Sequence, residues 1–188
     1  MSKTALLMID FQNDYFTSCA GAKLPLKGAE AASEHGARLL DAFRKKGFLV
    51  VHVRHENLKK NAPFFVPGSV GAEIHPSVAP IGGETVIVKH RANSFLDTGL
   101  KEALDRNKVT DLVIAGAMSN MCVDAVTRAA ADLGYKCAVA HDACAARDLE
   151  FNGVAVPALQ VHTAFMAALN SGYARVAGTD ELLAGLGR

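Results

Sequence analysis

The sequence predicts an α/β fold: a three-layer α/β/α sandwich in which helices cover both faces of a six-stranded, mainly parallel, doubly wound sheet. Short β-branched segments alternate with longer alanine-rich segments along the whole chain. The short segments are almost continuously apolar, which is typical of strands buried on both faces. No repeat or charge block marks a second domain. We therefore predict one domain over residues 1–188, which is long enough to bury a stable core.

The apolar segments and the stretches between them define the elements in chain order. The predicted strands are residues 4–9, 48–53, 85–88, 112–115, 137–140 and 174–177. The predicted helices are residues 29–46, 100–107, 120–133 and 157–169, and a short one after Thr179. In the first helix Leu39, Leu40 and Phe43 share a face, and Gly47 follows it as a stop signal. We expect the Thr179 hydroxyl to cap the last helix.

One segment interrupts this alternation. Residues 54–83 hold four prolines, Pro63, Pro67, Pro76 and Pro80, and several glycines. Loops of this length inside a compact domain usually have a function. We predict an ordered lid or an interface arm.

The composition excludes several function classes. With 20 basic and 19 acidic residues, the formal charge of +1 gives no footprint for nucleic acid or for an anionic membrane. Apolar runs such as residues 48–53 are too short to cross a bilayer. No export signal is visible, so we expect a cytoplasmic protein with a small-molecule substrate. The cysteines have no CxxC spacing, which predicts free thiols at Cys19, Cys122, Cys137 and Cys144.

Reactive side chains follow three of the predicted strands. Asp10 follows the first, Lys89 the third, and the turn from Gly116 to Cys122 the fourth. In an open α/β sheet, ligands bind beyond the carboxyl ends of the strands. Cys122 is expected in the first turn of a helix, where the helix dipole favours a thiolate. Asp10 could accept the thiol proton, Lys89 could hold the carboxylate, and backbone N–H groups of the turn could bind an oxyanion.

Four segments resemble a known family. The sequence is similar to the isochorismatase-like cysteine hydrolases, the superfamily that includes nicotinamidases and N-carbamoylsarcosine amidohydrolases. The likeness extends over nearly the whole chain, and its segments are residues 5–16, 86–95, 113–123 and 133–143. The resemblance implies a Rossmann-type sheet of six parallel strands.

The resemblance also implies a site and a chemistry. By position, the catalytic residues of the family fall on Asp10, Lys89 and Cys122. A cis peptide is implied between Ala117 and Met118, with the N–H groups of Met118 and Cys122 as the oxyanion hole. The cysteine favours attack on an amide, ureido or carbamoyl carbon and a thioester intermediate. Relatives of this kind assemble, so we expect a homo-oligomer, a dimer or tetramer.

We predict no cofactor and no metal. Nicotinamidases carry an Asp-Xaa-His metal motif after the second strand, and this chain lacks the aspartate there. His52, His55 and Glu56 could still bind zinc, although two histidines and one glutamate make a poor ligand set.

Several residues are candidates for the substrate pocket. The predicted walls are Phe16, His55, Phe95 and Asn120, and Phe64 or Phe65 could form a lid. Arg54 and Arg91 could bind a substrate carboxylate, although exposed arginines are usually plain surface. His162 and Asp142 are interpreted as structural.

Two other function classes stay open at this stage. One is a redox-sensing thiol protein in which Cys122 is oxidised, with Cys137 or Cys144 as its resolving partner. The other is a non-catalytic binding module on the same fold. A dinucleotide-binding role is disfavoured because no GxGxxG follows the first strand.

Overall fold

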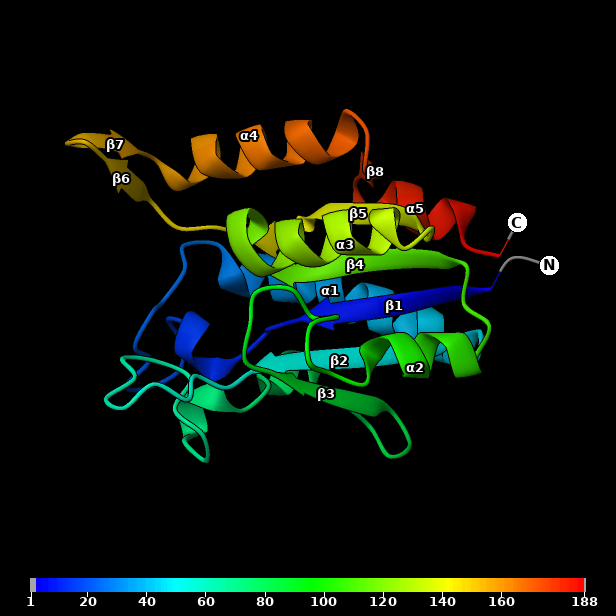
Figure 1. The fold of residues 1–188 in the computed structure, drawn as a ribbon, viewed down its shortest axis with the longest axis horizontal. Helices are drawn as coiled ribbons and strands as arrows, with labels where there is room; N and C mark the ends of the chain where they lie inside the picture. The colour runs from blue at the N-terminus through cyan, green and yellow to red at the C-terminus, as the bar shows by residue number, and fades with distance from the viewer. Residues whose placement is uncertain (1–2, 188) are drawn as a thin grey trace.

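A computed structural model describes residues 3–187 (Figure 1). Its main sheet has six strands in the order β3-β2-β1-β4-β5-β8, and neighbouring strands are parallel throughout. The strands are β1 Thr4–Ile9, β2 Leu49–His55, β3 Thr85–Lys89, β4 Asp111–Ala117, β5 Lys136–Ala145 and β8 Ala174–Ala177. The predicted six-stranded parallel sheet is confirmed.

Helices cover both faces of this sheet. They are α1 Ala29–Lys45, α2 Leu100–Arg106, α3 Asp124–Asp132, α4 Ala158–Asn170 and α5 Thr179–Gly185. Side chains alternate along β1: Leu6 and Met8 join the core beneath α1 and α5, whereas Leu7 and Ile9 join the core beneath α2, α3 and α4. Two apolar cores on opposite faces of one sheet make the three-layer sandwich.

The parallel register brings the carboxyl ends of four strands to one edge. Ile9 at the end of β1 lies opposite Val53 in β2 and Gly116 in β4. His55 at the end of β2 lies opposite Lys89 at the end of β3. The strand order reverses between β1 and β4, where such folds form a ligand crevice.

A short antiparallel hairpin was not predicted. Its strands are β6 Leu149–Phe151 and β7 Val154–Val156, and it projects from the sandwich beside the start of α4 (Figure 1). Asn152 and Gly153 form its turn with positive φ angles of 50° and 75°. Asn-Gly between two apolar segments is a strong hairpin signal, so the sequence contained the cue.

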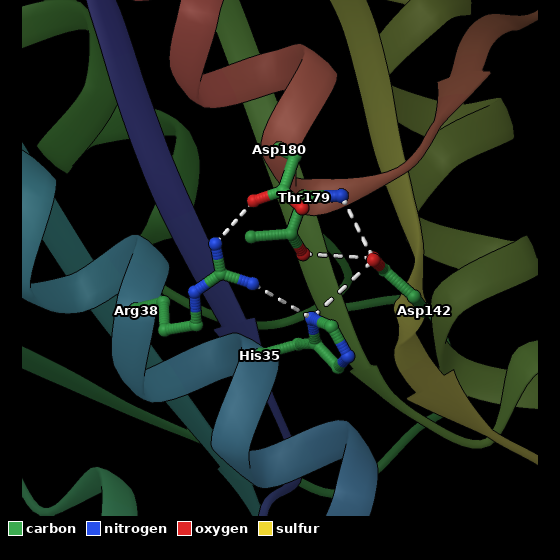
Figure 2. A network of polar contacts seen from close by, with 5 residues as sticks. All are labelled: His35, Arg38, Asp142, Thr179 and Asp180. Carbon is green, nitrogen blue, oxygen red and sulfur yellow. Dashed lines mark hydrogen bonds and ion pairs between the residues drawn. The ribbon is translucent and has the colours of Figure 1, made fainter.

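The cap of α5 differs from the prediction. Thr179 is the first residue of the helix, and its hydroxyl donates to Asp142 Oδ1 at 2.7 Å (Figure 2). Its backbone N–H also donates to this carboxylate, at 2.9 and 3.0 Å. The cap is therefore a carboxylate from β5, because Thr179 lies one residue too far into the helix to cap it.

The segment 54–83 is ordered and tied to the start of the chain. It includes 3₁₀ turns at Val70–Ala72 and Pro76–Val78. The buried Asp14 carboxylate accepts hydrogen bonds from the backbone N–H groups of Phe65, at 2.7 Å, and of Lys23, at 3.0 Å. A Cβ on Gly71 would lie 2.3 Å from this carboxylate, so only glycine fits there. No helix in residues 3–187 is long and apolar enough to cross a membrane.

Candidate active site

A buried lysine stands at the centre of the site. Lys89 ends β3, and its side chain is fully buried. Its Nζ lies 2.7 Å from Asp10 Oδ2, 3.1 Å from His55 Nδ1 and 3.2 Å from Cys122 Sγ. An ammonium group has three N–H donors. Each donor therefore has one partner, and the lysine fixes the carboxylate, the imidazole and the thiol relative to one another.

The backbone at the end of β1 holds Asp10 in an uncommon conformation. Its φ is +51°, and its N–H donates to Val53 O at 2.9 Å. Such conformations cluster at functional sites when the surrounding structure enforces them. Gly116 in β4 passes close to the same place: a Cβ on it would lie 2.0 Å from Ile9 O. The close approach of β1 and β4 thus brings the carboxylate next to the turn that carries the thiol.

Gln12 fixes His55 and was missed by the sequence analysis. The side chain is fully buried, and its Oε1 accepts from His55 N at 2.7 Å. Its Nε2 donates to His55 O and to Ala72 O, both at 2.8 Å. A buried glutamine with its amide fully engaged holds the end of β2 against the loop 54–83. Its position two residues after Asp10 was the available signal.

Cys122 lies in a π-helical turn, Ser119–Val123, immediately before α3. The prediction of a first α-helical turn is therefore wrong in detail, since the α-helix begins only at Asp124. Single π turns are frequent at functional sites. The sulfur is buried and faces the cavity at the sheet edge.

The electrostatics favour a neutral thiol rather than the expected thiolate. Burial raises the pKa of Cys122 far above its usual value, the Asp10 carboxylate raises it further, and Lys89 opposes both. Burial disfavours the charged form of Lys89, but Asp10 and Cys122 outweigh this and raise the pKa of the lysine. Burial and then the Lys89 charge lower the pKa of His55. The resting site thus pairs a charged lysine with a neutral imidazole and a protonated thiol.

Asp10 is the available proton acceptor. Apart from the ion pair with Lys89, its carboxylate has no hydrogen-bond donor in the part of the chain that the structure describes, although it is fully buried. The carboxylate, the His55 ring and Cys122 Sγ offer atoms within 4.8 Å of one another. A buried acceptor without a donor, beside a thiol, is a suitable general base.

Asp10, His55 and Cys122 are residue types that can bind a metal ion, but the position of Lys89 disfavours a metal site here. Lys89 Nζ contacts all of them and so occupies the position that a cation would take. The other zinc candidates are engaged elsewhere: His52 Nε2 lies 2.9 Å from Glu84 Oε2, and Glu56 pairs with Arg54 at 2.9 Å. His52, His55 and Glu56 therefore do not converge.

The turn after β4 contains the implied cis peptide, between Ala117 and Met118. The next residue, Ser119, is fully buried, and its hydroxyl donates to Ala145 O at 3.2 Å. His162 Nδ1 of α4 lies 2.8 Å from the same hydroxyl. Because that hydroxyl proton is directed at Ala145, His162 acts as the donor. His162 thus supports the turn from outside the cavity, a structural role that the sequence analysis did not specify.

The thiol opens into a cavity of about 650 Å³, within the size range of small-molecule sites. The cavity is lined by Asp10, Tyr15, His55, Asn57, Leu58, Lys59, Phe64, Phe65, His90, Arg91, Ala92, Met118, Met121 and Cys122. Asp10, His55, Met118 and Cys122 are among the predicted site residues, and Phe64 and Phe65 come from the loop 54–83.

Three predicted wall residues do not line this cavity. Phe16 is fully buried and stacks on His75, with ring centroids 3.7 Å apart. Phe95 is half-buried; it stacks on Tyr135, with ring centroids 6.0 Å apart, and packs against the core beneath α2 and α3. Asn120 is half-buried with its Oδ1 buried, and it is not among the residues that line the cavity. The placement of these side chains in the wall is corrected, since none of the three lines the cavity.

Tyr15 is a wall residue that the sequence analysis missed. It lies in the 3₁₀ turn Asn13–Tyr15, and its ring packs edge-on against Phe65 at 4.8 Å. Burial, followed by Cys122 and Asp10, raises the pKa of its phenol, which stays neutral. A neutral phenol at the cavity wall is a hydrogen-bond donor for a substrate.

Comparison with known proteins identifies relatives over almost the whole chain. The sequence model of the Isochorismatase domain matches residues 4–180. The isochorismatase family protein YddQ of Bacillus subtilis, which is uncharacterized, is 48% identical over 96% of this chain and 98% of its own. Maleamate amidohydrolase of Pseudomonas putida is 34% identical over 74% of this chain and 71% of its own.

Solved structures with the same fold also cover almost the whole chain. A crystal structure from Oleispira antarctica, described as an isochorismatase hydrolase, superposes with a TM-score of 0.95 at 65% identity, over 98% of this chain and 97% of that one. An isochorismatase from Pseudomonas putida gives a TM-score of 0.87 at 38% identity, over 95% and 89%.

Proposed function

Since this chain belongs to the isochorismatase family of hydrolases, we propose that it is a cysteine hydrolase that cleaves a small amide, ureido or carbamoyl C–N bond through a thioester. The observation that carries the proposal is the contact of one buried ammonium, Lys89, with a carboxylate, a neutral imidazole and a thiol. The amidohydrolase name of the Pseudomonas putida relative adds support for this bond type.

In the first half of the reaction the thiol attacks the substrate. Asp10 takes the Cys122 proton as the sulfur bonds to the carbonyl carbon, and Lys89 stabilises the negative charge of the site. The N–H groups of Met118 and Cys122 are the proposed donors to the carbonyl oxygen as it becomes an oxyanion. The C–N bond then breaks, and the nitrogen leaves as ammonia or an amine with the proton that Asp10 held.

In the second half, water releases the product. Asp10, again a carboxylate, removes a proton from a water molecule that attacks the thioester carbon. The C–S bond breaks, and the proton held by Asp10 returns to the sulfur. One water is consumed, and the acid product leaves the thiol as it was. Each half therefore uses the same carboxylate, and Lys89 keeps its charge throughout.

A redox-sensing role for Cys122 remains the second candidate. All four cysteines are free, and burial raises the pKa of Cys144 to about 12 and that of Cys137 to about 11. Thiols this reluctant to ionise attack a sulfenate slowly. This chemistry favours acyl transfer at Cys122 over disulfide formation.

Turnover by matched cysteine variants tests the proposal. The wild type, Cys122→Ser and the control Cys137→Ser would be assayed against a panel of small amides, ureides and carbamoyl compounds. We expect Cys122→Ser to lose hydrolysis by several orders of magnitude, with Cys137→Ser close to wild type. An acyl adduct on Cys122, seen by mass spectrometry after rapid quenching, supports the thioester. Turnover that survives Cys122→Ser overturns the nucleophile assignment.

A further inference from the structure

The mouth of the cavity carries positive charge. Lys59 of the loop 54–83 and Arg91, two residues after β3, both line the cavity and are exposed. Asp10 is the one carboxylate among the lining residues, and it is ion-paired with Lys89 in the interior. The lining therefore holds two exposed cations that no lining acid neutralises.

Arg91 differs in this respect from Arg54, an arginine near the end of β2 at the same edge of the sheet. The guanidinium of Arg54 pairs with Glu56 at 2.9 Å and does not line the cavity. Neither Arg91 nor Lys59 has an ion pair among residues 3–187. A free guanidinium at a cavity mouth can bind a carboxylate with two parallel hydrogen bonds.

The backbone that presents these cations is held in place. Lys59 N–H donates to Asn57 Oδ1 at 3.2 Å, and Asn57 N–H donates to Phe65 O at 2.9 Å. On the other side, His90 Nδ1 lies 2.9 Å from Glu56 O, to which it can only donate. The two cations thus lie on segments that hydrogen bonds hold in place, Lys59 after β2 and Arg91 after β3.

Many of the other side chains that line the cavity are apolar. They include Leu58, Phe64, Phe65, Ala92 and Met121. A ligand complementary to this lining therefore has its scissile carbonyl at Cys122, apolar groups that contact these side chains, and an anionic group at the two exposed cations.

We propose that the substrate is an anionic amide whose carboxylate, at the end away from the scissile bond, binds to Arg91 and Lys59. This inference rests on the proposed function and names the substrate class of that same site. The geometry excludes a buried position for the anion, because the interior is already neutralised by the pair of Lys89 and Asp10. The carboxylate instead lies at the rim, where the uncompensated cations are.

Alkylation of Cys122 tests the charge preference without knowledge of the substrate. Iodoacetate and iodoacetamide transfer similar groups to a thiolate with loss of iodide, but only iodoacetate is anionic. The rate of each at Cys122 would be measured by peptide mass mapping, which separates it from Cys19. The Asp10 carboxylate is present in every variant, so its repulsion of iodoacetate is the same in each. The informative quantity is therefore the change in the ratio of the two alkylation rates between variants.

The ratio of iodoacetate to iodoacetamide rates is expected to fall in Arg91→Ala and in Lys59→Ala, by about two- to fivefold for each charge removed. It should also fall as salt is added. Lys60→Ala is the matched control, because Lys60 is exposed and adjacent but does not line the cavity. Arg91→Lys should keep most of the ratio. An unchanged ratio in both alanine variants overturns the inference.

A turnover measurement separates this inference from the proposed function. Succinamate, a monoamide with a free carboxylate, would be compared with the uncharged butyramide. Arg91→Ala should raise the KM for succinamate at least severalfold more than the KM for butyramide. Hydrolysis with no charge preference, together with an unchanged alkylation ratio, sinks the inference and leaves the proposed function standing. A falling ratio with no turnover of any amide keeps the positively charged, anion-binding mouth and sinks the proposed function.

Discussion

Two polar clusters join distant parts of this chain, and they differ in how completely their groups are satisfied. One surrounds Lys89 at the ends of β1, β2 and β3, where the ammonium and the Asp10 carboxylate are fully buried. The other surrounds Asp142 of β5 and links it to α1 and α5 (Figure 2). Both lie near the carboxyl-end edge of the sheet. Only the first leaves a buried oxygen, on Asp10, without a hydrogen-bond donor among the described residues.

The Asp142 cluster is saturated instead. Thr179 donates to both carboxylate oxygens, and His35 Nδ1 lies 3.3 Å from Oδ2. Arg38 of α1 pairs with Asp180 at the surface beside it (Figure 2). A carboxylate with all its partners stabilises a fold, whereas a buried carboxylate that still lacks a donor is available for proton transfer. By this criterion the Asp142 cluster stabilises the fold, whereas the Lys89 cluster is suited to catalysis.

Removal of the Lys89 charge should have the largest effect on both stability and activity. A small effect would contradict the distinction between the two clusters. Lys89→Met leaves the Asp10 carboxylate buried without its cation, so we expect a loss of about 3–5 kcal/mol in the free energy of unfolding. Hydrolysis should fall by several orders of magnitude. Urea unfolding and a turnover assay measure the two effects.

The double variant Asp10→Asn with Lys89→Met separates folding from chemistry. It removes both charges, so most of the lost stability should return while hydrolysis stays absent. Lys101→Met, which removes an exposed cation paired with Asp105, is the control and should leave the stability close to that of the wild type, because water screens exposed ion pairs. A single Lys89→Met variant as stable as this control would contradict the burial argument.

Gly116→Ala should have the next largest effect. The backbone of Gly116 has a φ of +140°, and an added Cβ would lie 2.0 Å from Ile9 O. Because backbone cannot move aside as a side chain can, we expect a loss of several kcal/mol and of activity. Gly172→Ala meets no atom within 4 Å and should be nearly neutral. Thermal unfolding of both variants tests the close approach of β1 and β4.

The sequence predicted the features that follow from chain order and register. Apolar segments placed the six strands within two residues of their observed bounds, except that β5 continues to Ala145, five residues beyond the predicted end. Because parallel strands end at one edge, the convergence of Asp10, Lys89 and Cys122 followed from their positions after three strands. The turn Asn152-Gly153 shows that a local hairpin signal was also readable, and it was overlooked.

The walls of the cavity could not be predicted in the same way. Phe16 and Phe95 follow motifs at the correct edge, yet they stack on His75 and Tyr135. Whether an aromatic ring enters the core or a cavity depends on its rotamer and on long-range neighbours, which periodicity does not encode. The neutral thiol of Cys122 escaped prediction for a related reason, since desolvation depends on the final packing.

Substitution of Asp142 should have a moderate effect on stability and none on chemistry. In Asp142→Asn an NH2 group replaces one carboxylate oxygen, and this group cannot accept a hydrogen bond from Thr179 or His35. We expect a loss of about 1 kcal/mol in the free energy of unfolding near neutral pH, with kcat unchanged. Urea unfolding with a parallel turnover assay measures both. A large loss of activity would instead place this cluster in the active site.

The pH dependence of this effect has a definite sign. Burial disfavours the Asp142 carboxylate, but hydrogen bonds from Thr179, followed by the charge of His35, lower its pKa below the ordinary value of 3.8. The stabilisation by the ionised form is therefore fully present above pH 3.8 and is lost as the pH falls through the lower folded pKa. The difference between wild type and Asp142→Asn should shrink in acid. A difference that grows instead would contradict the assignment.

The exposed end of the same cluster should matter least. Arg38 and Asp180 form an ion pair, but the side chain of Asp180 is 83% exposed and that of Arg38 is 48% exposed. Exposed pairs gain little because water screens the attraction and ordering two side chains costs entropy. Asp180→Asn should thus change the free energy of unfolding by less than about 0.5 kcal/mol, and added salt should erase even that. Urea unfolding of this variant beside Asp142→Asn, at low and high salt, compares two acids of one network. Equal losses in the two variants would contradict this expectation, because the exposed Asp180 would then contribute as much stability as the hydrogen-bonded Asp142.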